Sequence, residues 1–219
     1  MKVDLTMNDR NNLRFQALYG ALVPQIARQV PFTEPEVSCL LLIYYKYSLQ
    51  NGPSSRRITN VQFGKIVIGF QQLYDMDVVD RIVTLITGDR KYVTPMEFIQ
   101  YMTIVMTCDI ERKMDFAYMI YDKFGLGINR EVISNAVEKF FPGEDDEVLE
   151  MRLDMVEFLI LKFDEDQDGI ITFDEYKSVV LRQPHLLEFL GPIFPSKEIR
   201  QVIAYCSALY SHIPELITM

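Results

Sequence analysis

The sequence of 219 residues contains no tryptophan, only two histidines and only three cysteines. Both histidines, His185 and His212, stand near the C-terminal end, outside any motif of a catalytic base. No cysteine lies in a nucleophile motif, and no glycine-rich phosphate loop is present. These absences exclude the enzyme classes that depend on such groups, so we expect a protein without catalytic activity.

The three cysteines, Cys39, Cys108 and Cys206, are odd in number and widely separated. They lack the spacing of metal ligands, and a disulfide framework needs paired cysteines. We therefore expect free thiols that behave as small hydrophobic side chains in a reducing compartment.

Long apolar runs are also missing. The longest mainly apolar stretch covers residues 37–45, whereas a membrane-spanning helix needs about 20 residues. The opening segment MKVDLTMNDRNNLRF has no signal-peptide core, and Lys2 after Met1 excludes N-myristoylation. We expect a soluble protein of the cytoplasm without membrane insertion.

Basic residues are in deficit. The chain has 22 Lys and Arg against 31 Asp and Glu, a net charge of −9 and a pI near 4.8. Nucleic acid is an unsuitable partner, because its phosphates require clustered Lys and Arg. A cation or a basic target helix suits this charge better. A hydrophobic content of 49% is enough for a folded core.

One segment carries a strong metal-binding pattern. The twelve residues DEDQDGIITFDE, from Asp164 to Glu175, place oxygen-bearing side chains at positions 1, 3, 5, 9 and 12 and Gly169 at position 6. This is the spacing of an EF-hand calcium loop. The predicted ligands are the carboxylates of Asp164, Asp166 and Asp168, the backbone carbonyl of Ile170, the hydroxyl or a bridging water of Thr172, and a bidentate Glu175.

The surroundings of this loop recur upstream. Ile58, Val93 and Ile128 match Ile171, the residue at loop position 8, because each is followed by a small polar residue and, five positions on, by a bulky apolar one. The repeat predicts an all-α fold of four helix-loop-helix units with short β-bridges between paired loops. We expect Ile58 to pair with Val93 and Ile128 with Ile171.

The three upstream loops lack the ligands that calcium needs. The first has Gln62 at position 12 and the basic connection NGPSSRRIT, and the second keeps Glu97 but carries Arg90 and Lys91. The third, DKFGLGINREV, is one residue short and retains only Asp122 among the main ligands. We therefore predict one calcium ion per chain, in the fourth loop, with the other loops serving as structural partners.

Helix signals set the expected domains. Thr33 and Glu36 form a capping box that starts the first EF-hand helix. An additional helix should precede it, weakened near Pro24. We predict an N-terminal lobe at residues 1–106, a C-terminal lobe at 107–182 and a helical tail at 183–219. The tail is apolar, and its burial in the C-lobe groove is favoured over docking on a partner.

The segments FTEPEVSCLL, LKFDEDQDGIITFDEY and LLEFLGPIFP resemble the calaxin family, the EF-hand calcium sensors of ciliary outer dynein arms. The likeness covers roughly residues 30–196, within the wider group of neuronal calcium sensors and calcineurin B-like proteins. It implies a place in the cilium or flagellum axoneme, with coiled-coil docking-complex subunits and dynein heavy chain as partners. This chain departs from the family in the second and third loops, where usable ligands are generally present.

Three functions stay open at this point. The leading one is a calcium sensor or adaptor of the outer dynein arm docking complex that modulates ciliary motor activity. The second is a structural docking subunit with one constitutive calcium ion. The third is a calcineurin B-like regulatory subunit of a phosphatase.

Overall fold

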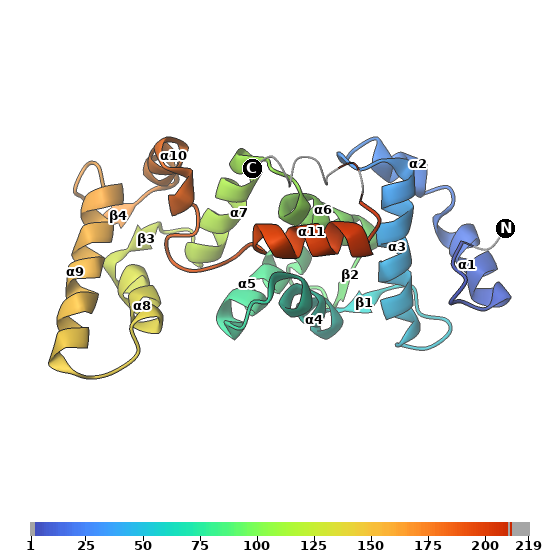
Figure 1. Cartoon of the computed structure of the whole chain (residues 1–219), viewed down its shortest axis with the longest axis horizontal. Helices are drawn as coiled ribbons and strands as arrows, with labels where there is room; N and C mark the ends of the chain where they lie inside the picture. The colour runs from blue at the N-terminus through green and yellow to red at the C-terminus, as the bar shows by residue number, and fades with distance from the viewer. Residues whose placement is uncertain (1–2, 210, 212–219) are drawn as a thin grey trace. The chain divides into compact units, whose positions relative to one another are not determined.

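The computed structural model describes residues 3–209 and 211, and this part of the chain is largely helical (Figure 1). The helices are α1 Asp9–Tyr19, α2 Val23–Ala27, α3 Glu34–Leu49, α4 Asn60–Gln71, α5 Met76–Thr87, α6 Pro95–Met106, α7 Ile110–Tyr121, α8 Arg130–Phe140, α9 Asp146–Phe163, α10 Phe173–Arg182 and α11 Lys197–Cys206, with a 3-10 helix η1 at Pro184–Leu186. The strands are β1 Ile58–Thr59, β2 Tyr92–Val93, β3 Ile128–Asn129 and β4 Ile170–Ile171. The predicted all-α class is confirmed. In the described ranges, no helix has both the length and the apolar character that a bilayer crossing requires.

The four loops pair through two antiparallel bridges. Ile58 lies opposite Val93, and Ile128 lies opposite Ile171. All four side chains are buried, so each bridge joins two loops through an apolar contact as well as through the backbone. Both predicted pairings are confirmed.

The polar residue after each bridge residue has a definite role, because it caps the next helix. Thr59, Thr94, Asn129 and Thr172 are the N-caps of α4, α6, α8 and α10, and each side chain accepts a hydrogen bond from a backbone N–H three residues on. Such a cap satisfies a donor that the first helical turn leaves unpaired. The sequence repeat is therefore a bridge residue followed by a helix start.

The N-terminal region contains two short helices. α1 ends at Tyr19, followed by Gly20, and α2 begins at Val23 with Pro24 in its first turn. Proline is favoured there because its missing N–H would have no helical partner. Pro24 thus starts a new helix after a break. The predicted capping box of Thr33 and Glu36 is present at the start of α3.

The described chain divides into two compact units. Unit 1 comprises the described residues within 1–108 and 194–219, and unit 2 comprises residues 109–193. In unit 1 the buried Tyr44 hydroxyl donates to the Val93 carbonyl oxygen (2.6 Å), and in unit 2 the Tyr118 hydroxyl donates to that of Ile171 (2.9 Å). Each bridge is thereby fixed to the helix that enters the first loop of its pair, α3 in unit 1 and α7 in unit 2. The division into an N-terminal lobe at 1–106, a C-terminal lobe at 107–182 and a helical tail at 183–219 stays a prediction.

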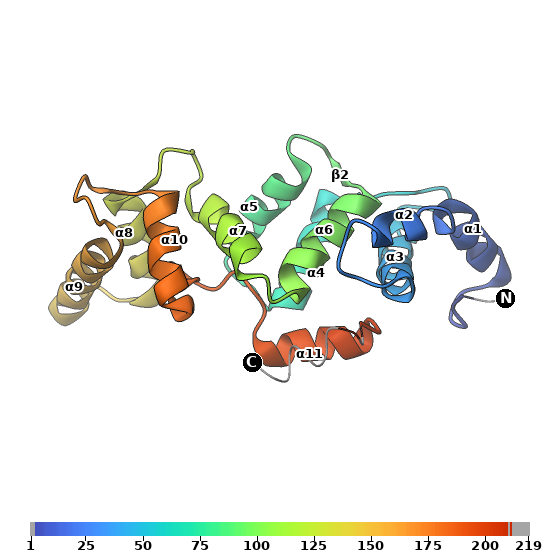
Figure 2. The same ribbon diagram turned by 90° about the horizontal axis from the view of Figure 1, so that it is seen from above.

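The C-terminal tail splits between two burial sites. Phe189 packs into the aromatic cluster of unit 2, where its ring centroid lies 4.1 Å from that of Phe163. The following helix, α11, instead packs against α4 and α6 of unit 1 (Figure 2). The expectation that the tail fills the C-lobe groove therefore holds for Phe189 and is wrong for α11. The physical reason is that Ile203 and Ala204 of α11 are buried in unit 1.

Candidate metal centre

The fourth loop lies between the end of α9 and the start of α10. α9 ends at Phe163, and Asp164 is its C-cap. The chain then turns through residues 165–169, forms the β4 bridge and enters α10 behind the N-cap Thr172. Gly169 adopts a φ of 87°, a conformation that glycine reaches without a steric penalty. The loop is thus anchored by a helix at each end and by β4 in the middle.

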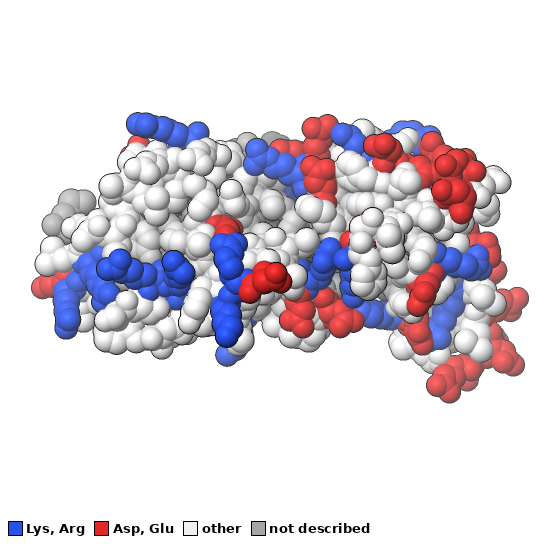
Figure 3. Space-filling view, turned by 180° about the vertical axis from the view of Figure 1, so that it is seen from behind, with Lys and Arg blue, Asp and Glu red and all other residues white. Residues whose placement is uncertain are grey.

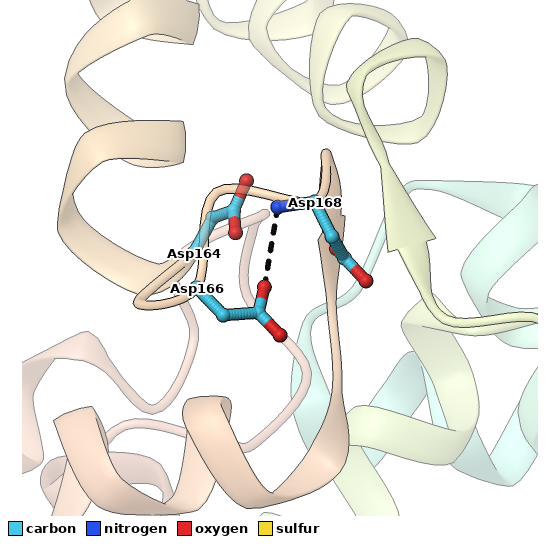
Figure 4. Close-up of side chains that lie close together, drawn as sticks. All are labelled: Asp164, Asp166 and Asp168. Carbon is cyan, nitrogen blue, oxygen red and sulfur yellow. Dashed lines mark hydrogen bonds between the residues drawn. The ribbon is translucent and has the colours of Figure 1, made fainter.

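Three carboxylates converge in this loop (Figure 4). One ligand oxygen from each of Asp164, Asp166 and Asp168 lies within 4.8 Å of the others. Backbone donors hold them in place: the Gly169 N–H donates to Asp164 Oδ2 (3.0 Å), that of Asp168 to Asp166 Oδ1 (3.2 Å), and that of Ile170 to Asp168 Oδ1 (2.8 Å). Each carboxylate keeps a second oxygen free of these bonds.

The second oxygen of Asp164 gives a direct test of whether the residues fit a cation. Asp164 is only 6% exposed, and its Oδ1 is buried without a hydrogen-bond donor. A buried carboxylate oxygen without a partner costs free energy. A hard cation that prefers oxygen ligands removes this cost. The donor set therefore fits calcium.

Glu175 closes the loop from the first turn of α10. Its Oε1 accepts hydrogen bonds from the backbone N–H groups of Glu165 (2.8 Å) and Asp166 (3.4 Å), and its Oε2 accepts from the N–H (2.8 Å) and hydroxyl (2.7 Å) of Thr172. Burial raises the pKa of this carboxyl, but these hydrogen bonds outweigh it and lower the pKa below its usual value. Glu175 is thus held ionised across the loop.

The six predicted ligand residues lie on this one loop. The three aspartates form the cluster itself, and Glu175 reaches the same turn through Glu165 and Asp166. The Ile170 backbone is part of β4, opposite Asn129. The Thr172 hydroxyl is engaged with Glu175. Among residues 3–209 and 211, no second group of three or more acidic, Cys or His ligands lies as close together.

Loop 1 is closed by amide groups. Gln62, at position 12, accepts a hydrogen bond at Oε1 from Asn51 Nδ2 (2.7 Å), and Asn51 stands at position 1 of the same window. Gln62 Nε2 also donates to the Tyr47 carbonyl oxygen at the end of α3 (3.1 Å). Positions 1 and 12 are the ends that a bound ion joins in a working loop. Sequence reasoning missed this link, although Asn and Gln at those two positions were its signal.

Loop 2 is closed by an internal ion pair. Arg90, at position 5, pairs with Glu97 at position 12, and its Nε donates to the Thr87 carbonyl oxygen (3.0 Å). Burial raises the pKa of Glu97. Hydrogen bonds from the Thr94 N–H and the Arg90 guanidinium lower it by more, so the pKa lies below its usual value. In the sequence, Arg90 is a positive charge in a loop that lacks calcium ligands. In the structure, its guanidinium also takes the place of a cation beside the Glu97 carboxylate.

Loop 3 is closed by its single aspartate. Asp122 accepts hydrogen bonds from the N–H groups of Leu126 (3.0 Å) and Gly127 (3.0 Å). Phe124 and Leu126 are exposed and contribute no oxygen. Gly127 has a φ of 84°, and a Cβ there would lie 2.3 Å from Ile170 Cγ2. The short third loop is therefore fitted tightly against the fourth.

Comparison with known proteins gives a consistent result. No protein-family model matches the chain. Calaxin of Danio rerio is 25% identical over 194 residues, covering 84% of this chain and 90% of that protein. Calaxin of Homo sapiens is 28% identical over 180 residues, covering 75% of this chain and 81% of that protein. Calaxin of Xenopus laevis is 25% identical over 175 residues, covering 76% and 83%. Taken with the two pairs of helix-loop-helix units, these similarities support a calaxin-like protein with an EF-hand fold.

Proposed function

We propose that the chain binds one calcium ion in the loop from Asp164 to Glu175 and uses it to regulate docking on protein partners. The observation that carries this proposal is the cluster of three aspartates with the buried, unpartnered Oδ1 of Asp164. Calcium supplies the positive charge that the cluster lacks. The ligands would be the carboxylates of Asp164, Asp166, Asp168 and Glu175, the Ile170 carbonyl oxygen and the Thr172 hydroxyl or a water.

The loop is connected to the core of unit 2 by the two residues that flank it. Phe163 precedes Asp164 and Tyr176 follows Glu175, and their rings stack with centroids 6.2 Å apart. Both rings also contact Phe189. The Tyr176 hydroxyl donates to the Leu187 carbonyl oxygen (2.7 Å). A shift of Glu175 relative to Asp164 therefore acts on the position of residues 187–189.

The surface of unit 2 supports a basic, amphipathic protein segment as the partner. Residues 109–193 contain 9 Lys and Arg and 20 Asp and Glu, a net charge of −11, whereas the remainder of the chain has 13 and 11, a net charge of +2. α9 also exposes large apolar side chains, which are Leu149, Met151, Leu153, Phe158 and Leu161. An amphipathic helix with basic residues complements both properties.

The calaxin likeness supports a proposal for the cellular setting. The proposed location is the cilium or flagellum axoneme, where the chain would join the outer dynein arm docking complex, with coiled-coil subunits and dynein heavy chain as partners. Co-purification from isolated cilia tests this placement. Recovery with a phosphatase catalytic subunit instead would support the calcineurin B-like alternative.

Titration calorimetry tests the metal site. We expect a stoichiometry near one and a dissociation constant of about 10⁻⁷ to 10⁻⁵ M, the range of sensor EF-hands. Glu175→Gln should abolish binding because the bidentate ligand is lost. Glu97→Gln is the matched control, since it alters position 12 of loop 2, where Arg90 holds the carboxylate. Two or more strong sites would contradict the assignment of the other loops.

One observation favours a structural role for the ion as a second candidate. Phe189 already fills the aromatic cluster beside the loop, and such an internal occupant holds unit 2 in one form. If the ion is constitutive, the affinity for a docking partner should be the same with calcium and with a chelator. A calcium-dependent affinity would favour the sensor.

A further inference from the structure

Unit 1 carries a basic pocket beside the two loops that lack calcium ligands. The pocket has a volume of about 420 Å³ and is lined by Arg57, Arg90, Lys91, Tyr92 and Thr94. Arg57 immediately precedes β1, and Arg90 and Lys91 immediately precede β2. The pocket thus lies at the β1–β2 bridge and involves none of the residues of the fourth loop.

The charge of the pocket is positive even after internal pairing is considered. Arg90 pairs with Glu97, and Asp89 is an exposed neighbour in the chain. Arg57 and Lys91 are exposed and form no ion pair within the described residues. Figure 3 shows Lys and Arg side chains gathered on this face, over the region of the β1 and β2 loops. Two cations are therefore available to an outside ligand.

The backbone that carries these cations is fixed by hydrogen bonds. The Arg57 carbonyl oxygen accepts from Asn51 Nδ2 (3.1 Å), the Arg90 carbonyl oxygen accepts from Asn60 Nδ2 (2.7 Å), and that of Lys91 accepts from the Asn60 N–H (3.2 Å). Because the backbone is already fixed, a ligand that binds here has to order only the side chains.

The positions of the cations select the shape of the ligand. The antiparallel register places Arg57 next to Thr94, three residues from Lys91 on the neighbouring strand, which corresponds to about 10 Å along a strand. Two exposed cations at this backbone separation suit a ligand that carries more than one anionic group. An extended chain, whose alternate side chains lie about 7 Å apart, presents several carboxylates over the same length.

Two further groups complete the site. Thr94 caps α6, so the positive end of that helix dipole borders the pocket. The half-exposed ring of Tyr92 offers an apolar wall for the methylene groups of a glutamate. α11 packs on α4 and α6 and is absent from the pocket lining, so this helix leaves the site open.

We propose that this pocket binds a short Asp/Glu-rich segment of a protein partner. The site goes beyond the calcium function, because its residues belong to loops closed by their own side chains. It gives the chain a second attachment point of opposite charge preference to the acidic surface of unit 2.

Fluorescence anisotropy with labelled octaglutamate and octaglutamine peptides at physiological salt tests the proposal. We expect the glutamate peptide alone to bind, and the double variant Arg57→Ala with Lys91→Ala to weaken binding at least tenfold. Arg28→Ala with Lys65→Ala is the matched control, because it removes two exposed cations of unit 1 outside the pocket. This control should change the affinity by less than twofold.

Several results would overturn the proposal. An equal loss in both double variants would show general charge attraction, and full displacement by millimolar phosphate would show a simple anion site. Binding to phosphatidylserine vesicles that depends on the pocket, without peptide binding, would show a membrane surface instead. An unfolding transition of unit 1 in urea, followed by circular dichroism, that matches the transition of the unaltered chain confirms that each double variant is folded. Glu175→Gln should bind the peptide normally, so failure of the calcium proposal is separately detected.

Discussion

Phe189 is expected to be a main support of unit 2, although it lies beyond the last EF-hand helix. Its side chain is 8% exposed, and its ring contacts Phe163, Tyr121 and Tyr176 with centroid distances of 4.1, 5.5 and 5.8 Å. Replacing a buried phenylalanine by alanine typically costs about 3–5 kcal/mol, since the transfer free energy is lost and a cavity remains. We expect Phe189→Ala to lower the free energy of unfolding of unit 2 by this amount.

The assay is urea unfolding of the calcium-loaded chain followed by circular dichroism, because the sequence has no tryptophan for fluorescence. With a denaturant slope of about 1–3 kcal/mol/M, the midpoint of the unit 2 transition should fall by at least about 1 M. Phe124→Ala is the matched control, because the Phe124 side chain is 82% exposed and should change stability by less than about 0.5 kcal/mol. Equal effects of the two variants would refute the reasoning.

Two further predictions concern the backbone and pH. Gly127→Ala should destabilise unit 2 by about 1–3 kcal/mol in the same unfolding assay, because the new Cβ would clash with Ile170 and the residue has a positive φ. Gly69→Ala is the control. Gly69 lies in helix α4 with open space around it, so this variant should be neutral or stabilising. The hydrogen bond from Lys46 lowers the pKa of Asp4 from 3.8 to about 2. This depressed pKa contributes stability that is present above pH 3.8 and is lost as the pH falls towards 2. Asp4→Asn should therefore flatten the decline in the stability of unit 1 between these two pH values. A decline as steep as that of the unaltered chain would contradict the assignment.

The sequence predicts those parts of the fold that depend on neighbouring residues. The pairs Ile58–Val93 and Ile128–Ile171 follow from a repeat in which a bridge residue precedes a helix cap. The aspartate cluster follows in the same way, because all of its members lie on one twelve-residue loop and the spacing alone determines which side chains converge.

Long-range contacts account for what the sequence leaves unpredicted. The position of α11 depends on apolar surfaces of α4 and α6, which no local pattern of residues 197–206 encodes. The same holds for Glu36, which caps α3 as predicted but also accepts hydrogen bonds at Oε1 from the N–H (2.9 Å) and hydroxyl (2.6 Å) of Ser211. Such tertiary partners have no signature in sequence spacing.

The amide link of Gln62 and the ion pair of Arg90 with Glu97 have a consequence for how the chain responds to its medium. Their closing groups are covalently part of the polypeptide, so neither dilution nor a chelator can remove them. We expect unit 1 to keep one conformation throughout a calcium transient while unit 2 changes. A partner held by unit 1 would therefore stay attached during signalling, and only contacts with unit 2 would come and go.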